Sequence, residues 1–192
     1  MTENKDNNIN IRLIEKINQV EKENNKEFSN TQKILLTTDG SITAILDVLH
    51  GKIDLKTLEQ HFEASTEESA KLVNVDVGDE VNYREIIMHK DENPLIYAVS
   101  YIPIKRLNQS IKEDLIRADI PIGRILKKYN IESRREINEI KIEKADEKLK
   151  ELYNTDEDFL ARDYTIIKDG EILMWIKEYF PITYFVEKDN IN

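Results

Sequence analysis

The chain has 192 residues, 40% of them hydrophobic, which is enough for one domain with its own core. Its 38 acidic and 28 basic residues give a formal net charge of −10, which disfavours general binding to nucleic-acid phosphates. The absence of cysteine excludes disulfides, thiolate nucleophiles and Cys-ligated metal centres. No apolar run approaches the roughly 20 residues of a membrane span, and the polar start does not resemble a signal peptide. We therefore expect a cytoplasmic protein that binds neither nucleic acid nor membrane.

The first quarter of the chain has a helical character. Residues 1–8 are polar, and we expect them to be disordered ahead of a single domain over residues 9–192. Apolar spacing predicts an amphipathic helix over residues 11–20. Residues 30–51 then predict a helix, a sharp turn and a second helix, with Gly51 as the C-cap.

The middle of the chain is dominated by strand patterns. A strand is expected over residues 52–65, followed by a polar loop over 66–70 and β-like spacing of the valines between 73 and 81. Two cleaner strands, 81–89 and 95–104, flank a turn cluster that contains proline. This arrangement predicts an antiparallel hairpin.

The last third of the chain mixes short helices and strands. Its first segments are two short helices, a weak strand and a charged helix, over residues 108–118, 124–129, 131–142 and 144–153. Two final strands, 159–168 and 171–180, are joined by Asp169-Gly170, a strong signal for a two-residue hairpin turn.

Counting these segments gives about six strands and four or five short helices. Strands follow one another through tight turns, so the sheet should be mostly antiparallel. We identify no internal repeat. The predicted fold class is α+β.

Several common catalytic groups are missing from the sequence. It contains no P-loop, no G-x-G-x-x-G motif and no nucleophile elbow. The three histidines, His50, His61 and His89, share no spacing typical of metal ligands. We therefore expect no metal and no cofactor.

Four local features carry chemical interest. Backbone N–H groups near Ile42, at the start of a helix, can bind an anion, and the bend at Ile122 exposes others. Arg84 lies within an apolar strand, and Glu178 lies among large apolar residues near a strand end. Each also has an ordinary explanation, as a helix cap, a turn or a side chain that faces solvent, and periodicity alone leaves both open.

The order of these features resembles the chorismate pyruvate-lyase family, in particular its divergent branch formerly described as a domain of unknown function. The resemblance covers about residues 30–185 and rests on the runs TTDGSIT, YREI, LIYAVSYIPI, PIGRIL and KDGEILMWIKEYFPI. It implies a six-stranded antiparallel sheet with helices on one side. It also implies that two helix–turn–helix lids enclose a small buried site.

The resemblance implies conversion of chorismate to 4-hydroxybenzoate and pyruvate without a cofactor. Arg84 matches an arginine that contacts the ligand carboxylate, and Glu178 matches a carboxylate that contacts the ring hydroxyl. Ile42 and Ile122 match positions that offer backbone N–H groups from the two lids. Arg84 and Glu178 are therefore the expected catalytic residues, and all four positions are expected to bind substrate.

The chain also departs from this pattern. It carries a charged insert, about residues 143–158, where better-known lyases are shorter and have paired arginines; Arg134, Arg135 and Arg162 are candidates for that role. A ligand-binding or sensing domain of the same fold is the main alternative. An interaction domain, with both expected catalytic residues facing solvent, is a third hypothesis. We expect a monomer or a homodimer.

Overall fold

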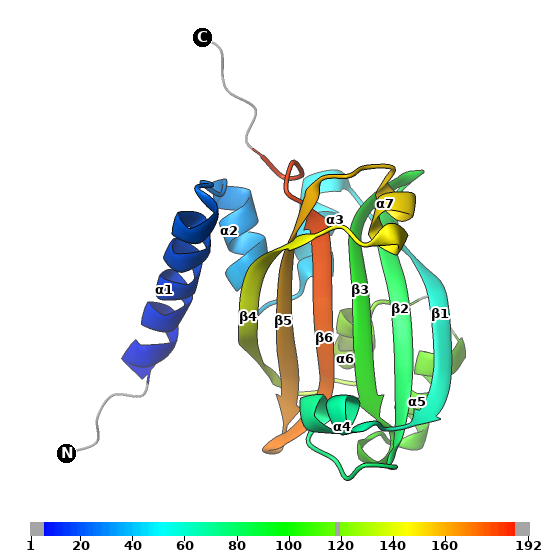
Figure 1. Ribbon diagram of the computed structural model, residues 1–192. Coiled ribbons are helices and arrows are strands. Elements are labelled where there is room, and N and C mark those ends of the chain that lie inside the picture. The colour runs from blue at the N-terminus through cyan, green and yellow to red at the C-terminus, as the bar shows by residue number, and fades with distance from the viewer. Residues whose placement is uncertain (1–5, 118–119, 187–192) are drawn as a thin grey trace, which may run out of the picture.

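The computed structural model describes residues 6–117 and 120–186, and its centre is one antiparallel sheet (Figure 1). The six strands are β1 (Asp54–Ala64), β2 (Glu80–Lys90), β3 (Asn93–Pro103), β4 (Arg134–Lys144), β5 (Asp158–Lys168) and β6 (Glu171–Pro181). Their order across the sheet is β1-β2-β3-β6-β5-β4, and all neighbours are antiparallel. The predicted α+β class and antiparallel sheet are confirmed.

Helices cover both faces of the sheet. The described residues form α1 (Asp6–Asn24), α2 (Asn30–Thr37), α3 (Ile42–His50), α4 (Glu67–Val73), α5 (Gln109–Arg117), α6 (Ile122–Lys128) and α7 (Glu147–Tyr153), with a 3-10 turn at Ile104–Arg106. The predicted helix–turn–helix pairs, α2–α3 and α5–α6, share one face, which we call the inner face. Helices α4 and α7 lie on the other, outer face, and α1 stands beside β4 (Figure 1).

The two halves of the sheet repeat each other, so the expectation of no internal repeat was wrong. A helix, a strand, a second helix and a two-stranded hairpin follow in the same order from α3 and again from α6. Strand β5 begins 78 residues after β2, and β6 begins 78 residues after β3. Val99 pairs with Lys177, its own counterpart 78 positions later, so a pseudo-two-fold axis passes between β3 and β6.

Helix α4 replaces a segment that was expected to be a loop and then a strand. Thr66 accepts a hydrogen bond from the Ser69 amide, and the Ser69 hydroxyl accepts one from the Thr66 amide, which forms a capping box. Asn74, in the left-handed conformation at φ 51°, ends the helix. The predictions of a loop over 66–70 and of β structure over 73–81 were therefore wrong.

Both hairpins turn through two residues. Lys90 and Asn93 pair across the first turn, and Lys168 and Glu171 pair across the second. Asp91 and Asp169 take the same positive φ of 52°, and Gly170 has φ 85°, which a residue with a Cβ rarely adopts. These turns confirm the predicted hairpins.

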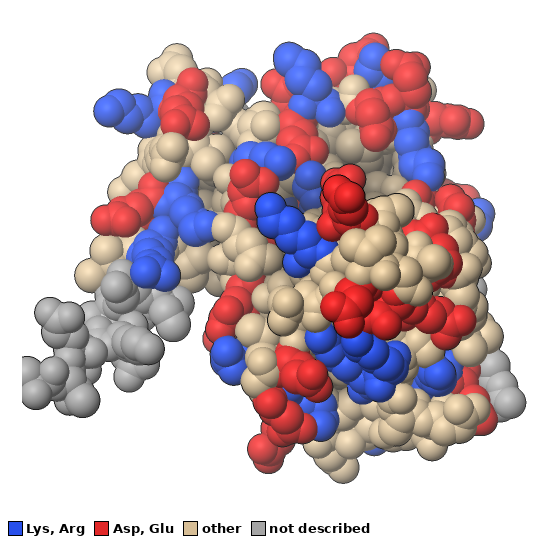
Figure 2. Space-filling view, turned by 60° about the horizontal axis from the view of Figure 1, so that its bottom comes forward, with Lys and Arg blue, Asp and Glu red and all other residues tan. Residues whose placement is uncertain are grey.

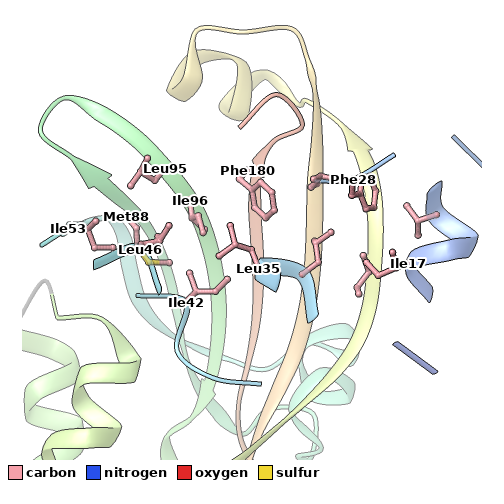
Figure 3. Packing of buried hydrophobic residues seen from close by; sticks show 14 of the residues in the cluster. Ile17, Phe28, Leu35, Ile42, Leu46, Ile53, Met88, Leu95, Ile96 and Phe180 are labelled. Carbon is pink, nitrogen blue, oxygen red and sulfur yellow. The ribbon is translucent and has the colours of Figure 1, made fainter. Parts of the chain in front are cut away.

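The helices of the inner face are anchored by buried side chains (Figure 3). Leu35 and Leu46, from α2 and α3, pack in one cluster with Ile96 and Phe180 of the sheet, and all four are fully buried. A second cluster joins α5 and α6 to the far end of the same face. Burying one such side chain stabilises the fold by about 1.5–3 kcal/mol. These contacts therefore hold both helix pairs against the sheet.

The predicted N-terminal helix is confirmed as α1. Of the segment expected to be disordered, residues 1–5 lie outside the described residues, and α1 begins at Asp6. On the face that Figure 2 presents, acidic and basic side chains are interspersed rather than segregated. No helix in the described part of the chain is long and apolar enough to cross a membrane.

Candidate functional site

A cavity, here called the central cavity, lies between the inner face of the sheet and the two helix–turn–helix lids. It is lined by strands from both halves and by the first residues of α3 and α6. The lining residues are Ser41, Ile42, Thr43, Arg84, Ile86, Met88, Ala98, Ser100, Pro121, Ile122, Gly123, Arg135, Tyr164, Ile166, Ile176 and Glu178.

The lids meet at the starts of two helices. Ser41 caps α3 by accepting a hydrogen bond from the Ala44 amide at 3.4 Å. A Cβ added to Gly123, near the start of α6, would lie only 2.9 Å from Ser41 Oγ, so glycine permits this close approach. Ile42 and Ile122 line the cavity in the first turns of α3 and α6, where backbone N–H groups have no acceptor within their own helix.

Arg84 reaches the cavity from β2 and is 1% exposed. Its guanidinium donates to the Ile120 carbonyl at 3.3 Å, just before α6, and to Thr57 Oγ1 on β1 at 3.2 Å. The interaction with Ile120 connects an arginine of the first half to the lid of the second half. Because guanidinium keeps its charge at any physiological pH, Arg84 brings a permanent cation to the cavity wall.

Arg162 makes the reciprocal connection. It lies on β5 at the position equivalent to Arg84, is 1% exposed, and donates through Nη1 to the Thr38 carbonyl of the first lid at 2.8 Å. Its Nε donates to Glu178 Oε2 at 2.8 Å, across the register pair of β5 and β6. Its Nη2 has no hydrogen-bond partner among the described residues. Each half of the sheet thus holds the lid of the other half through a buried arginine.

Glu178 is held by two donors of β5. Besides Arg162, the Tyr164 hydroxyl donates to Glu178 Oε1 at 3.0 Å, and Glu178 itself is only 3% exposed. Complete burial and the nearby negative charge of Glu178 raise the pKa of the Tyr164 phenol, although Arg162 and Arg135 act in the opposite direction. Tyr164 therefore keeps its proton and serves as a hydrogen-bond donor.

The three candidate arginines occupy different environments. Arg134 is exposed and pairs with Glu136 at 2.8 Å, away from the cavity. Arg135 lines the cavity and donates to the Asp39 carbonyl of the first lid at 3.0 Å, while its Nε has no partner in the described ranges. Arg162 donates a hydrogen bond to Glu178 and does not itself line the cavity.

Arg124, within the PIGRIL run, belongs to α6 and contacts the other lid. It joins the two lids by pairing with Asp47 of α3 at 3.0 Å and does not line the cavity. Among residues 6–117 and 120–186, no group of three or more His, Asp or Glu side chains is placed to hold a metal ion.

The internal repeat extends to the cavity wall. Arg84 and Glu178 come from opposite halves and line the same cavity. Opposite Arg84 across the strand pair lies Ser100, whose counterpart in the second half is Glu178 opposite Arg162. The two ends of the cavity are therefore chemically different, although their backbones are equivalent.

Sequence reasoning missed Tyr164 and left Arg162 among three candidates. Arg162 and Tyr164 alternate along β5 with Ala161 and Thr165, which are also buried, so a pattern of alternating burial does not single them out. Counting back from the hairpin at Asp169-Gly170 in regular register would place Arg162 beside Lys177. A register shift between Ile166 and Ile167 moves the pairing by one residue and places Arg162 beside Glu178, and the sequence gives no sign of this shift.

A six-stranded antiparallel sheet with paired helical lids over one cavity is the chorismate lyase-like fold. A family model described as chorismate pyruvate-lyase Rv2949c-like matches residues 36–187. A curated relative from Methanocaldococcus jannaschii, named "Putative lyase MJ0807", is 42% identical over 167 residues, covering 82% of this chain and 83% of that protein. The chain belongs to the Rv2949c-like chorismate pyruvate-lyase family.

Solved structures of an effector domain and of a transcriptional regulator share this fold. The effector domain of PhnF from Mycobacterium smegmatis matches with a TM-score of 0.60 and 14% identity, over 74% of this chain and 88% of that one. A GntR-family transcriptional regulator from Bacillus cereus matches with a TM-score of 0.56 and 16% identity, over 73% and 99% of the two chains. At such low identity the likeness concerns the fold alone.

Proposed function

We propose that the protein is a chorismate pyruvate-lyase, which converts chorismate to 4-hydroxybenzoate and pyruvate in the central cavity. The observation that carries this proposal is the convergence of Arg84 and Glu178, from opposite halves of the sheet, on one cavity beneath two lids. Family membership supports the reaction class. The third hypothesis, an interaction domain, required both side chains to face solvent, and both are buried.

The proposed reaction draws its driving force from the substrate. The ether C–O bond of chorismate breaks, the ring loses a proton and becomes aromatic, and the departing enolpyruvate takes up a proton to give pyruvate. A protein needs only to orient the ring, accept the ring proton and stabilise charge on the departing oxygen. This chemistry suits a cavity whose polar groups are arginine, glutamate, tyrosine and backbone N–H.

In this proposal the two catalytic residues have different tasks. Arg84 binds the ring carboxylate, and its planar fork permits a bidentate pair that lysine cannot form. Glu178 orients the ring hydroxyl and takes part in proton transfer. A carboxylate has about four acceptor sites, so the hydrogen bonds from Arg162 and Tyr164 leave Glu178 acceptor capacity for a ligand.

Local charge favours a dianionic substrate in spite of the net charge of −10. Arg84 and Arg135 line the cavity and Arg162 lies beside it, whereas Glu178 is the one acidic residue among the lining residues described. Backbone N–H groups of Ile42 and Ile122 add positive potential from the lids. Charges inside an enclosed, poorly hydrated cavity act more strongly than those on the surface.

The second candidate function is a sensor that binds an aromatic carboxylate without turnover. It is favoured by the effector domain and the transcriptional regulator that share the fold. Incubating the purified protein with chorismate separates the two functions: pyruvate release that is lost in Arg84→Ala supports the lyase. Binding of 4-hydroxybenzoate without pyruvate release supports the sensor.

A further inference from the structure

The phenol hydroxyl of Tyr164 lies at the end of the central cavity where Glu178 is proposed to bind the ring hydroxyl of the ligand. It lines the cavity from β5, is 5% exposed, and donates to Glu178 Oε1 at 3.0 Å. The Arg162 guanidinium lies over its ring at 4.8 Å, so the aromatic plane is fixed from one side. Tyr164 is therefore a rigid polar group directed at the same carboxylate that the proposed function assigns to the ring hydroxyl.

The internal repeat shows what is special about this position. The counterpart of Tyr164 in the first half, 78 residues earlier, is Ile86, which also lines the cavity but has no polar atom in its side chain. The counterpart of Glu178 is Ser100. The Tyr–Glu pair thus exists at one end only, and it gives the cavity a direction that the backbone alone does not.

A phenol hydroxyl donates one hydrogen bond and accepts others. Tyr164 donates its hydrogen bond to Glu178, so the lone pairs of its oxygen can accept a hydrogen bond from a ligand hydroxyl in the cavity. A ligand hydroxyl next to Glu178 would then have two acceptors, the carboxylate and the Tyr164 oxygen. A ligand without that hydroxyl would leave both polar groups buried and poorly hydrated, which is costly.

We propose that Tyr164 is a specificity-determining residue, whose hydroxyl forms with Glu178 the binding site for the ring hydroxyl of the ligand. This inference rests on the proposed function for the position of the ligand. It makes the cavity selective for aromatic or cyclohexadienyl carboxylates that carry a hydroxyl opposite the carboxylate. Arg84 binds the carboxylate end, and Tyr164 with Glu178 binds the hydroxyl end.

The experiment compares 4-hydroxybenzoate with benzoate, two probes that differ only in the hydroxyl. Calorimetric titration of the wild-type protein should show at least about tenfold tighter binding of 4-hydroxybenzoate. Tyr164→Phe should weaken binding of 4-hydroxybenzoate by about tenfold and leave benzoate binding unchanged, because only the hydroxyl contact is lost. Circular dichroism and thermal unfolding monitor the fold of each variant.

Tyr97→Phe is the matched control. Tyr97 is also 5% exposed and also lies beside a buried carboxylate, that of Glu85, but it faces the outer side of the sheet. This variant should leave the affinities for both acids unchanged. A comparable loss in both tyrosine variants would show a general effect on the fold and would overturn the inference.

The outcomes separate the inference from the proposed function. Selectivity that disappears in Tyr164→Phe supports the inference even if chorismate is not turned over, in which case only the lyase proposal fails. Equal weakening of both acids by Tyr164→Phe assigns the residue a structural role and overturns the inference, whether or not pyruvate is released. Wild-type protein that binds the two acids equally also overturns it.

Discussion

Gly123 lies where the two lids touch, and replacing it by alanine puts a methyl group into that contact. The added Cβ would lie 2.9 Å from Ser41 Oγ and 3.6 Å from Ser41 Cβ. Either the Ser41 hydroxyl rotates away or the two lids move apart. Both responses alter the roof of the central cavity.

The two responses have different costs. Rotation of Ser41 gives up its hydrogen bond with the Ala44 amide, and loss of an N-cap costs about 0.5–2 kcal/mol. If the hydroxyl stays in place, overpacking costs about 1–3 kcal/mol or is relieved by opening the lids. A chain of this size loses about 2–4 °C in Tm per kcal/mol, so we expect Gly123→Ala to lower Tm by about 1–12 °C and to weaken binding of 4-hydroxybenzoate.

The assay is thermal unfolding together with titration of 4-hydroxybenzoate. Ser41→Gly should lower Tm only slightly, because replacing serine by glycine at an N-cap costs only about a few tenths of a kcal/mol. The double variant should recover part of what Gly123→Ala loses, with a coupling of at least about 0.5 kcal/mol. An unchanged Tm and affinity in Gly123→Ala, or losses that simply add in the double variant, would refute the lid contact.

Four further substitutions test the site and its supports. Arg84→Ala should weaken binding of 4-hydroxybenzoate by roughly 30-fold to several thousand-fold, since truncating one member of a buried charge pair costs about 2–5 kcal/mol. Wild-type affinity of this variant in calorimetry would contradict the prediction. Glu178→Gln should chiefly lower kcat, by about 100-fold or more, and unaltered steady-state kinetics would remove its role in proton transfer. Arg162→Met should cost about 3–5 kcal/mol in urea unfolding, because it leaves the Glu178 charge buried without its partner; a smaller loss than in Arg134→Met would be inconsistent with the ion pair. Partial burial alone would raise the pKa of Asp47, but hydrogen bonds from the Ile53 amide and Arg124 lower it, so its stabilising effect is present above about pH 4 and is lost as the pH falls further. Asp47→Asn should therefore flatten the fall of Tm between about pH 5 and pH 3, and an identical pH profile would show that the pair does not hold the lids.

Much of the fold follows from local patterns. The hairpins were predictable because Asp169-Gly170 and the cluster before Pro94 are turn sequences between apolar runs. Helix α4 was not, because its 7 residues are too few to show helical periodicity, and its start depends on reciprocal hydrogen bonds between Thr66 and Ser69. A charged helix such as α7 was recognisable from composition, although its exact start at Glu147 depends on the Asp146 cap.

The internal repeat was hidden by divergence of the side chains. The two hairpins share Lys-Asp where the turn begins and Pro-Ile where the second strand ends, within residues 90–104 and 168–182. Most positions between them differ, and a repeat conserved mainly in backbone leaves little sequence signal. Its consequence for the site is large, because it places Arg84 and Arg162 at equivalent positions around one cavity.

The candidate site was predictable only in part. Arg84 and Glu178 do line one cavity, but alternation could not show this, since β2 and β6 are largely buried on both faces. Tyr164 reads from the sequence as one more aromatic strand residue. Its contact with Glu178 depends on the pairing register of β5 and β6, which only the folded structure supplies.

The most direct test of the proposed elimination is simultaneous quantification of both products from chorismate. Purified protein is incubated with chorismate in the presence of EDTA, and pyruvate and 4-hydroxybenzoate are measured over time. The proposal predicts that the two products form in equal amounts, at a rate unaffected by the chelator and lost in Arg84→Ala. Tight binding of 4-hydroxybenzoate with no pyruvate above the uncatalysed background would contradict it and would identify the domain as a sensor.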